Sequence, residues 1–172
     1  MKMRIIKYIV VSIFSFVMLI GCGGKEEKNK DGFTYENKKS TTKKVEESNL
    51  SEVVLTTNDL MQFNKTEIKV KAGKKVKLTL KHIGKLDKKI MGHNFVLLKQ
   101  GVSISAFGNH AVTFAENDYI PENTKDIIVH TKLIGAGETT VIEFDAPAVG
   151  EYDFLCSFPG HYAIMKGKFI VE

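Results

Sequence analysis

Short segments of alternating apolar and polar residues, separated by turns that contain glycine, constrain the fold of this chain most strongly. The clearest is Val76-Lys-Leu-Thr-Leu-Lys-His82. Because successive side chains of a strand point to opposite faces, such alternation predicts a strand with one buried face. Similar segments are expected at residues 53–56, 67–70, 93–98, 126–130, 139–145, 151–156 and 166–171. Seven to eight short strands at this spacing predict an all-β chain folded as an antiparallel Greek-key sandwich.

One stretch of this region departs from the strand pattern. Residues 101–117 lack regular alternation, and one short helix is expected there. The sandwich and its helix are predicted to occupy residues 51–172.

The first 21 residues do not belong to this sandwich. Lys2, Arg4 and Lys7 precede a nearly unbroken apolar run that ends at Leu19-Ile-Gly-Cys22. A basic start followed by an apolar run is typical of a secretory signal, so residues 1–21 are expected to be removed on export. A small residue before a cysteine at this point resembles the signal of bacterial lipoproteins, in which Cys22 is lipidated and becomes the new N-terminus. The alternative is a transmembrane anchor that happens to end in a cysteine.

Residues 22–50 are dominated by Lys, Glu, Asn, Ser and Thr, with few apolar side chains. Such a segment buries too little apolar surface to offset the entropy lost on ordering. A flexible tether, with a reach on the order of 30 Å as a random coil, is therefore expected between the lipid and the sandwich.

The charge of the chain argues against nucleic acid as a partner. The whole chain has 25 Lys+Arg and 20 Asp+Glu, a net charge of +5. Removal of the three basic residues of the signal leaves 22 against 20, and the net charge falls to +2. Proteins that bind nucleic acid usually have a strongly basic face.

The second cysteine, Cys156, would be the only one in the exported domain and so could not form an internal disulfide. It stands in Cys156-Ser-Phe-Pro-Gly-His161-Tyr-Ala-Ile-Met165, which brings a thiol, an imidazole and a thioether onto one turn at the end of an expected strand. These donors suit copper, whose two oxidation states require both sulfur and nitrogen ligands. A trigonal site needs a second imidazole, and His93 offers one. The plain alternative for Cys156 is a buried, inert thiol.

At these residues the sequence resembles azurin, a member of the cupredoxin family of type 1 blue-copper proteins. The likeness includes the spacing of Cys156, His161 and Met165. It extends in order over Asn58-Asp-Leu-Met-Gln-Phe-Asn64, Met91-Gly-His-Asn94 and His130-Thr-Lys-Leu-Ile-Gly135. The resemblance covers residues 51–172 and implies a cupredoxin-like sandwich that holds one copper.

The resemblance also implies a ligand set. His93, Cys156 and His161 match the three strong copper ligands, Met165 matches the long axial thioether, and Gly92 matches the backbone carbonyl on the opposite side. Around them, the resemblance implies supporting roles for Asn94, which ties the two ligand segments together, and for Ser157 and Phe158. An apolar collar that surrounds the exposed edge of His161, and to which partners dock, is expected from Met91, Phe158, Pro159, Ala163 and Ile164.

Two features depart from the family pattern. The chain has no cysteines for the disulfide that the family usually has near the start of the domain, and it has no tryptophan, with Phe95 where one often stands. Both departures concern stability and spectroscopy rather than the copper ligands.

The function expected is electron transport rather than enzymatic catalysis, because ligands that all come from the protein leave no open position for a small-molecule substrate. The carrier would be exported, anchored to a bacterial membrane through Cys22, and placed in the periplasm or on the cell surface. Its partners would be a redox donor and a redox acceptor that bind transiently.

Two other functions remain open at this point. One is a thiol enzyme that uses Cys156 as nucleophile with His93 or His161 as base. The other is a lipoprotein that binds or delivers copper without relaying electrons. Among the remaining histidines, His82 is expected in the core or at its rim, and His110 and His130 at the surface.

Overall fold

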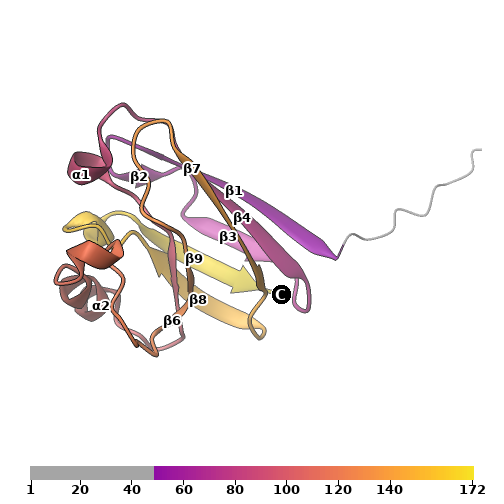
Figure 1. Cartoon of the computed structure of the whole chain (residues 1–172). Coiled ribbons are helices and arrows are strands. Elements are labelled where there is room, and N and C mark those ends of the chain that lie inside the picture. The colour runs from indigo at the N-terminus through magenta and orange to yellow at the C-terminus, as the bar shows by residue number, and fades with distance from the viewer. Residues whose placement is uncertain (1–48) are drawn as a thin grey trace, which may run out of the picture. The chain divides into compact units, whose positions relative to one another are not determined.

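Two β-sheets face each other in residues 49–172, the part of the chain that the computed structural model describes (Figure 1). The expected signal, the lipidation site at Cys22 and most of the expected tether lie outside the described residues. In spatial order, the four-stranded sheet contains β2 (Gln62–Phe63), β1 (Leu50–Asn58), β4 (Lys75–His82) and β7 (Thr139–Asp145). The five-stranded sheet contains β3 (Glu67–Val70), β9 (Lys166–Val171), β8 (Gly150–Leu155), β5 (Val96–Leu98) and β6 (Ile127–His130).

The all-β sandwich expected from the sequence is confirmed. The described part of the chain has nine strands rather than seven or eight, because β2 is only two residues long and leaves no alternation to detect. The expectation of purely antiparallel pairing is wrong at two places: β1 pairs with β4 and β3 with β9 in parallel. In the first case the chain crosses to the other sheet through β3 and returns beside β1 in the same direction, so that β1 and β4 run in parallel.

The expected short helix is α2 (Ile104–Ala111). It begins at Ser103, whose side-chain oxygen accepts the Ala106 N–H at 3.3 Å and so satisfies one of the free donors of the first turn. A single helical turn, α1 (Lys88–Met91), is capped in the same way by Asp87. The described residues also contain two 3-10 turns, η1 (Ala115–Asn117) and η2 (His161–Ala163). None of the helices within residues 49–172 has the length and apolar character needed to cross a membrane.

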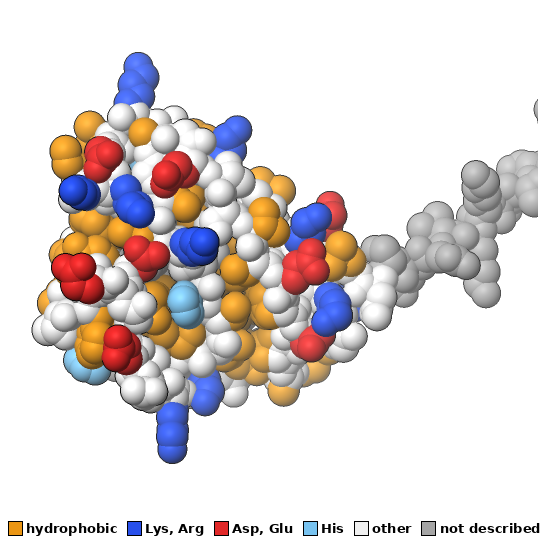
Figure 2. Space-filling model, viewed as in Figure 1, with side chains coloured by type: hydrophobic (Ala, Val, Ile, Leu, Met, Phe, Trp, Pro, Cys, Tyr) orange, Lys and Arg blue, Asp and Glu red, His pale blue; other side chains and the backbone are white. Residues whose placement is uncertain are grey.

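The two helices gather at one end of the sandwich. Figure 1 shows α1, α2 and the loop between β8 and β9 at this end, whereas the C-terminus lies at the other. On the face shown in Figure 2, charged side chains of both signs are interspersed with apolar ones. The end that carries α1, α2 and this loop is called the loop end below.

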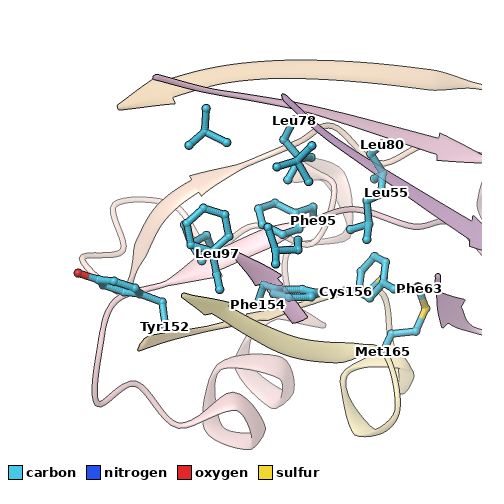
Figure 3. Packing of buried hydrophobic residues seen from close by; sticks show 14 of the residues in the cluster. Leu55, Phe63, Leu78, Leu80, Phe95, Leu97, Tyr152, Phe154, Cys156 and Met165 are labelled. Carbon is cyan, nitrogen blue, oxygen red and sulfur yellow. The ribbon is translucent and has the colours of Figure 1, made fainter. Parts of the chain in front are cut away.

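The space between the sheets is filled by apolar side chains that alternate along the strands. Val76, Leu78 and Leu80 are completely buried, as their pattern predicts. Figure 3 shows the row of core side chains running from Tyr152 at one end to Phe63 and Met165 at the other. Cys156 belongs to this same cluster, so the thiol is part of the packed core.

Candidate metal centre

Cys156 lies directly after β8 and is completely buried. Its own N–H donates to the Met165 carbonyl at 2.9 Å, which closes the loop between β8 and β9. Burial raises the pKa of the Cys156 thiol to about 12, and the backbone N–H groups of Asn94 and Phe158, which donate to the sulfur, limit the rise. The thiol therefore stays protonated near neutral pH unless a cation replaces the proton.

His93 stands just before β5 and is fixed by its backbone and by its ring. Its N–H and C=O exchange two hydrogen bonds of 2.9 Å with Ile134. Its Nε2 lies 2.9 Å from the Asn58 carbonyl and so must carry the proton, which leaves the lone pair on Nδ1. That Nδ1 lies 3.8 Å from the sulfur of Cys156.

His161 opens η2 and follows Gly160, whose φ of 79° lies in the left-handed region that glycine tolerates. Its Nδ1 lies 3.7 Å from the Cys156 sulfur, and the residue is only 3% exposed. Burial lowers the pKa of both His93 and His161 to about 4, with the charge of His161 as a further cause at His93. Both imidazoles are therefore neutral at pH 7, the state in which they can bind a metal.

The three donor atoms fit one metal ion. They lie within 4.8 Å of one another, although they come from two segments far apart in the sequence. Metal–nitrogen and metal–sulfur bonds of roughly 2.0 and 2.3 Å, set 120° apart, would place nitrogen and sulfur about 3.7 Å apart. The observed sulfur–nitrogen separations of 3.7 and 3.8 Å agree with this distance.

Two further expected ligands lie beside this trio. The Gly92 carbonyl oxygen is 3.9 Å from the Cys156 sulfur. A Cβ atom at Gly92 would meet the Lys88 carbonyl at 2.5 Å, so glycine is needed for residue 92 to lie this close to the backbone of α1. Met165 is 1% exposed and packs in the same core cluster as Cys156, and its N–H donates to the His161 carbonyl at 2.7 Å.

Asn94 and Ser157 join the two segments behind the donors. The Asn94 side chain accepts the Ser157 N–H at 2.9 Å and donates to the Ser157 hydroxyl at 2.8 Å. It also donates to the Asp118 carbonyl at 3.0 Å. Phe158, 9% exposed, lies with its ring 4.6 Å from that of His161 and tilted by 42° to it.

The other three histidines lie away from the trio or behind it. His110 and His130 are exposed, as expected from the sequence. His82 is completely buried, and its ring stacks on that of His93 at 4.7 Å. Its Nδ1 accepts the Gly84 N–H at 2.9 Å, so its Nε2 donates to the Met91 carbonyl at 3.1 Å. His82 thus supports the ring of His93 without joining the donors.

Several residues at the loop end were not predicted from the sequence. The Asn58 carbonyl and Asp118 act through the backbone or through a turn, which leaves no pattern in the sequence. Three exposed apolar side chains lie in polar segments: Leu60, Leu86 and Ile90. The contrast with their polar neighbours could have indicated an interaction surface from the sequence.

Comparisons with known proteins identify the class to which this fold and site belong. The family described as copper binding proteins, plastocyanin/azurin family, matches residues 49–172. The chain therefore belongs to the plastocyanin/azurin family of copper-binding proteins, and its cofactor is copper.

Individual relatives agree with this assignment. Azurin-1 of Alcaligenes xylosoxydans xylosoxydans is 47% identical over 114 residues, which cover 64% of this chain and 88% of that protein. Outer membrane protein H.8 of Neisseria meningitidis serogroup B is 45% identical over 114 residues, covering 64% of this chain and 62% of its own length. The solved azurin Az-iso2 of Methylomonas sp. strain J has a TM-score of 0.65 and 30% identity, and the match covers 70% of this chain and 97% of that one.

Proposed function

We propose that this chain is an exported, lipid-anchored electron carrier that cycles one type 1 copper between Cu(I) and Cu(II). The observation that carries the proposal is the convergence of one sulfur and two neutral imidazole nitrogens, all buried, within 4.8 Å. Donors that all come from the protein and are screened from water suit the transfer of electrons better than a reaction at a bound substrate.

In this proposal the Nδ1 atoms of His93 and His161 and the thiolate of Cys156 hold the copper. The Met165 thioether and the Gly92 carbonyl would serve as two weaker donors to the same copper. Bound copper would supply a one-electron couple, whose potential would depend on the weak thioether donor and on hydrogen bonds to the sulfur.

The surrounding hydrogen bonds hold the donors in place. The Asn58 carbonyl orients His93, and the Asn94 side chain holds the segment that carries Cys156. Two backbone N–H groups point at the sulfur and stabilise its charged form. Because these groups are already oriented, a change of charge at the site requires little rearrangement of the protein.

Partners are proposed to dock on an apolar surface beside His161. Pro159, Ala163 and Ile164 are exposed, Met91 is half-buried, and Phe158 lies against the His161 ring. Leu60, 69% exposed, lines the same surface hollow as Ile164 and extends this surface. A small apolar contact of this kind suits a brief encounter with a redox donor or acceptor better than a permanent complex.

The anchor is proposed at Cys22, after removal of residues 1–21, with residues 22–50 as the tether of the domain at 51–172. The apolar run, the Leu19-Ile-Gly-Cys22 sequence and the polar composition of the tether support this arrangement. The similar H.8 protein is named an outer membrane protein, which favours a membrane location as well. The domain would then lie in the periplasm or on the cell surface.

Electron self-exchange of the copper-loaded full chain tests the proposed relay. NMR line broadening in mixtures of the oxidised and reduced protein gives the rate, and voltammetry gives the potential. A carrier should exchange rapidly, and Ile164→Ser should slow exchange without moving the potential, because only the contact surface changes. Slow exchange with intact copper binding would instead favour the copper-delivery function.

The anchor is tested separately by metabolic labelling with a fatty acid. The wild-type chain should incorporate label and fractionate with membranes, and Cys22→Ala should do neither. Label retained by Cys22→Ala would place the lipid elsewhere.

A further inference from the structure

Tyr162, the residue after His161, connects the loop between β8 and β9 to helix α2. Its phenol donates a hydrogen bond of 2.7 Å to the side-chain oxygen of Asn109 on that helix. Its ring packs against a second cluster of buried apolar side chains, separate from the one between the sheets, which includes Phe107 and Ala111 of the same helix. One side chain therefore joins η2 to α2 through both a polar and an apolar contact.

Gly108 makes this contact possible. It is buried within α2, where glycine is one of the least favourable residues for a helix. A Cβ atom at this position would overlap the ring of Tyr162. The close approach of the ring to the helix backbone thus accounts for a glycine inside the eight-residue helix.

The turn held by Tyr162 contains or contacts three of the proposed ligands. The His161 carbonyl accepts the N–H groups of Ile164 and Met165 at 3.0 and 2.7 Å. The Met165 carbonyl in turn accepts the Cys156 N–H at 2.9 Å. A displacement of Tyr162 would therefore be transmitted through short backbone hydrogen bonds to His161, Met165 and Cys156.

We infer that Tyr162 is a positioning residue, through which Gly108 and Asn109 of α2 hold the His161 turn in its metal-binding geometry. The inference rests on the proposed copper site for its role, but the contacts themselves belong to the metal-free protein. Helix α2 is then a brace for the turn as well as a cover for the five-stranded sheet. The positioning operates before the metal arrives, so it lowers the rearrangement needed on binding.

Hydrogen exchange of the metal-free full chain, followed by NMR, tests the brace without copper. Tyr162→Ala should speed exchange of the Ile164 and Met165 amides by roughly tenfold or more, because local opening no longer breaks the contact with α2. Tyr162→Phe and Asn109→Ala should each give a smaller, equal increase, and their combination no more than either, since both remove the same hydrogen bond. Ser105→Ala is the control: Ser105 is exposed on α2, and its hydroxyl bonds to Ser103 rather than to η2.

Copper loading gives the second readout. Gly108→Ala should change the copper hyperfine splitting in the EPR spectrum, because the new methyl group displaces the Tyr162 ring. The same substitution in a Tyr162→Ala background should have no further effect, since the ring it strikes is gone. If Gly108→Ala does not fold, the Tyr162→Phe and Asn109→Ala pair still decides.

Two outcomes would overturn the inference. One is unchanged exchange at residues 164 and 165 in Tyr162→Ala. The other is a Gly108→Ala effect on the EPR spectrum that is just as large without the Tyr162 ring. A chain that bound no copper, but showed the expected exchange pattern, would refute the proposed function and leave the brace standing.

Discussion

At the scale of single residues, the protonation states of three side chains prepare the site for a metal. The Cys156 thiol has a pKa of about 12 and is protonated at pH 7, whereas His93 and His161, each with a pKa of about 4, are neutral. The cause in all three cases is burial, which disfavours the charged form. A metal must therefore displace a proton from sulfur but not from nitrogen.

Copper binding to the metal-free chain at pH 7 should release about one proton per copper, because only Cys156 has a proton to lose. Titration in a weakly buffered solution with a pH indicator measures the release. Cys156→Ser should release none, even if some copper still binds to the imidazoles. A release of two protons from the wild-type chain would mean that a histidine had been charged beforehand.

Met165→Leu should keep the absorption that arises from the Cys156 thiolate and move the reduction potential upward, because oxidised copper loses a donor. Leucine has a similar volume, so the free energy of unfolding should fall by less than about 1.5 kcal/mol. Voltammetry and urea unfolding measure the two quantities. An unchanged potential would show that the thioether does not reach the copper.

At the scale of elements, the site depends on a connection between the segment before β5, which carries His93, and the segment after β8, which carries Cys156. Asn94 supplies it through the two hydrogen bonds to Ser157. Both residues are completely buried, so a lost partner would not be replaced by bulk water.

Asn94→Ala should lower the free energy of unfolding of the metal-free chain by about 1–3 kcal/mol, since it leaves buried groups of Ser157 without partners. Asn64→Ala is a matched control: Asn64 also accepts a backbone N–H, from Thr56 at 2.8 Å, but in an exposed setting, so the loss should be smaller. Urea unfolding monitored by circular dichroism compares the two. Equal losses would argue against a special role for the buried connection.

The elements also show how far the sequence could be interpreted. The alternation in residues 76–82 predicted β4 correctly, and the spacing of Cys156, His161 and Met165 indicated copper because these donors share one turn. The stacking of His82 on His93 was not predictable, because it depends on the parallel pairing of β1 with β4. This pairing sets Thr57 beside His82, and the carbonyl of the next residue, Asn58, holds the ring of His93. Local patterns reveal faces and turns, whereas the register of distant strands is decided only when the whole sandwich packs.

At the scale of the whole molecule, the site is coupled to folding because its donors come from opposite halves of the domain. His93 and His161 have a lower pKa in the folded chain, about 4, than the ordinary value of 6.5. Between these values the unfolded chain binds more protons than the folded one. Acid therefore favours unfolding through these two groups.

The metal-free chain should lose stability progressively as the pH falls from about 6.5 towards 4, and this contribution should be fully present above pH 6.5. Urea unfolding at a series of pH values measures it. His161→Gln should flatten the dependence, because one of the two groups is removed. An equally steep dependence in this variant would assign the effect to other groups, such as carboxylates.

Titration of the metal-free full chain with Cu(II), followed by visible absorption and EPR, tests the central claim most directly. The account predicts an intense visible band that saturates at about one copper per chain and is absent in Cys156→Ser, although that variant still folds. A folded wild-type chain that stayed colourless, or a Cys156→Ser variant that kept the band, would contradict it.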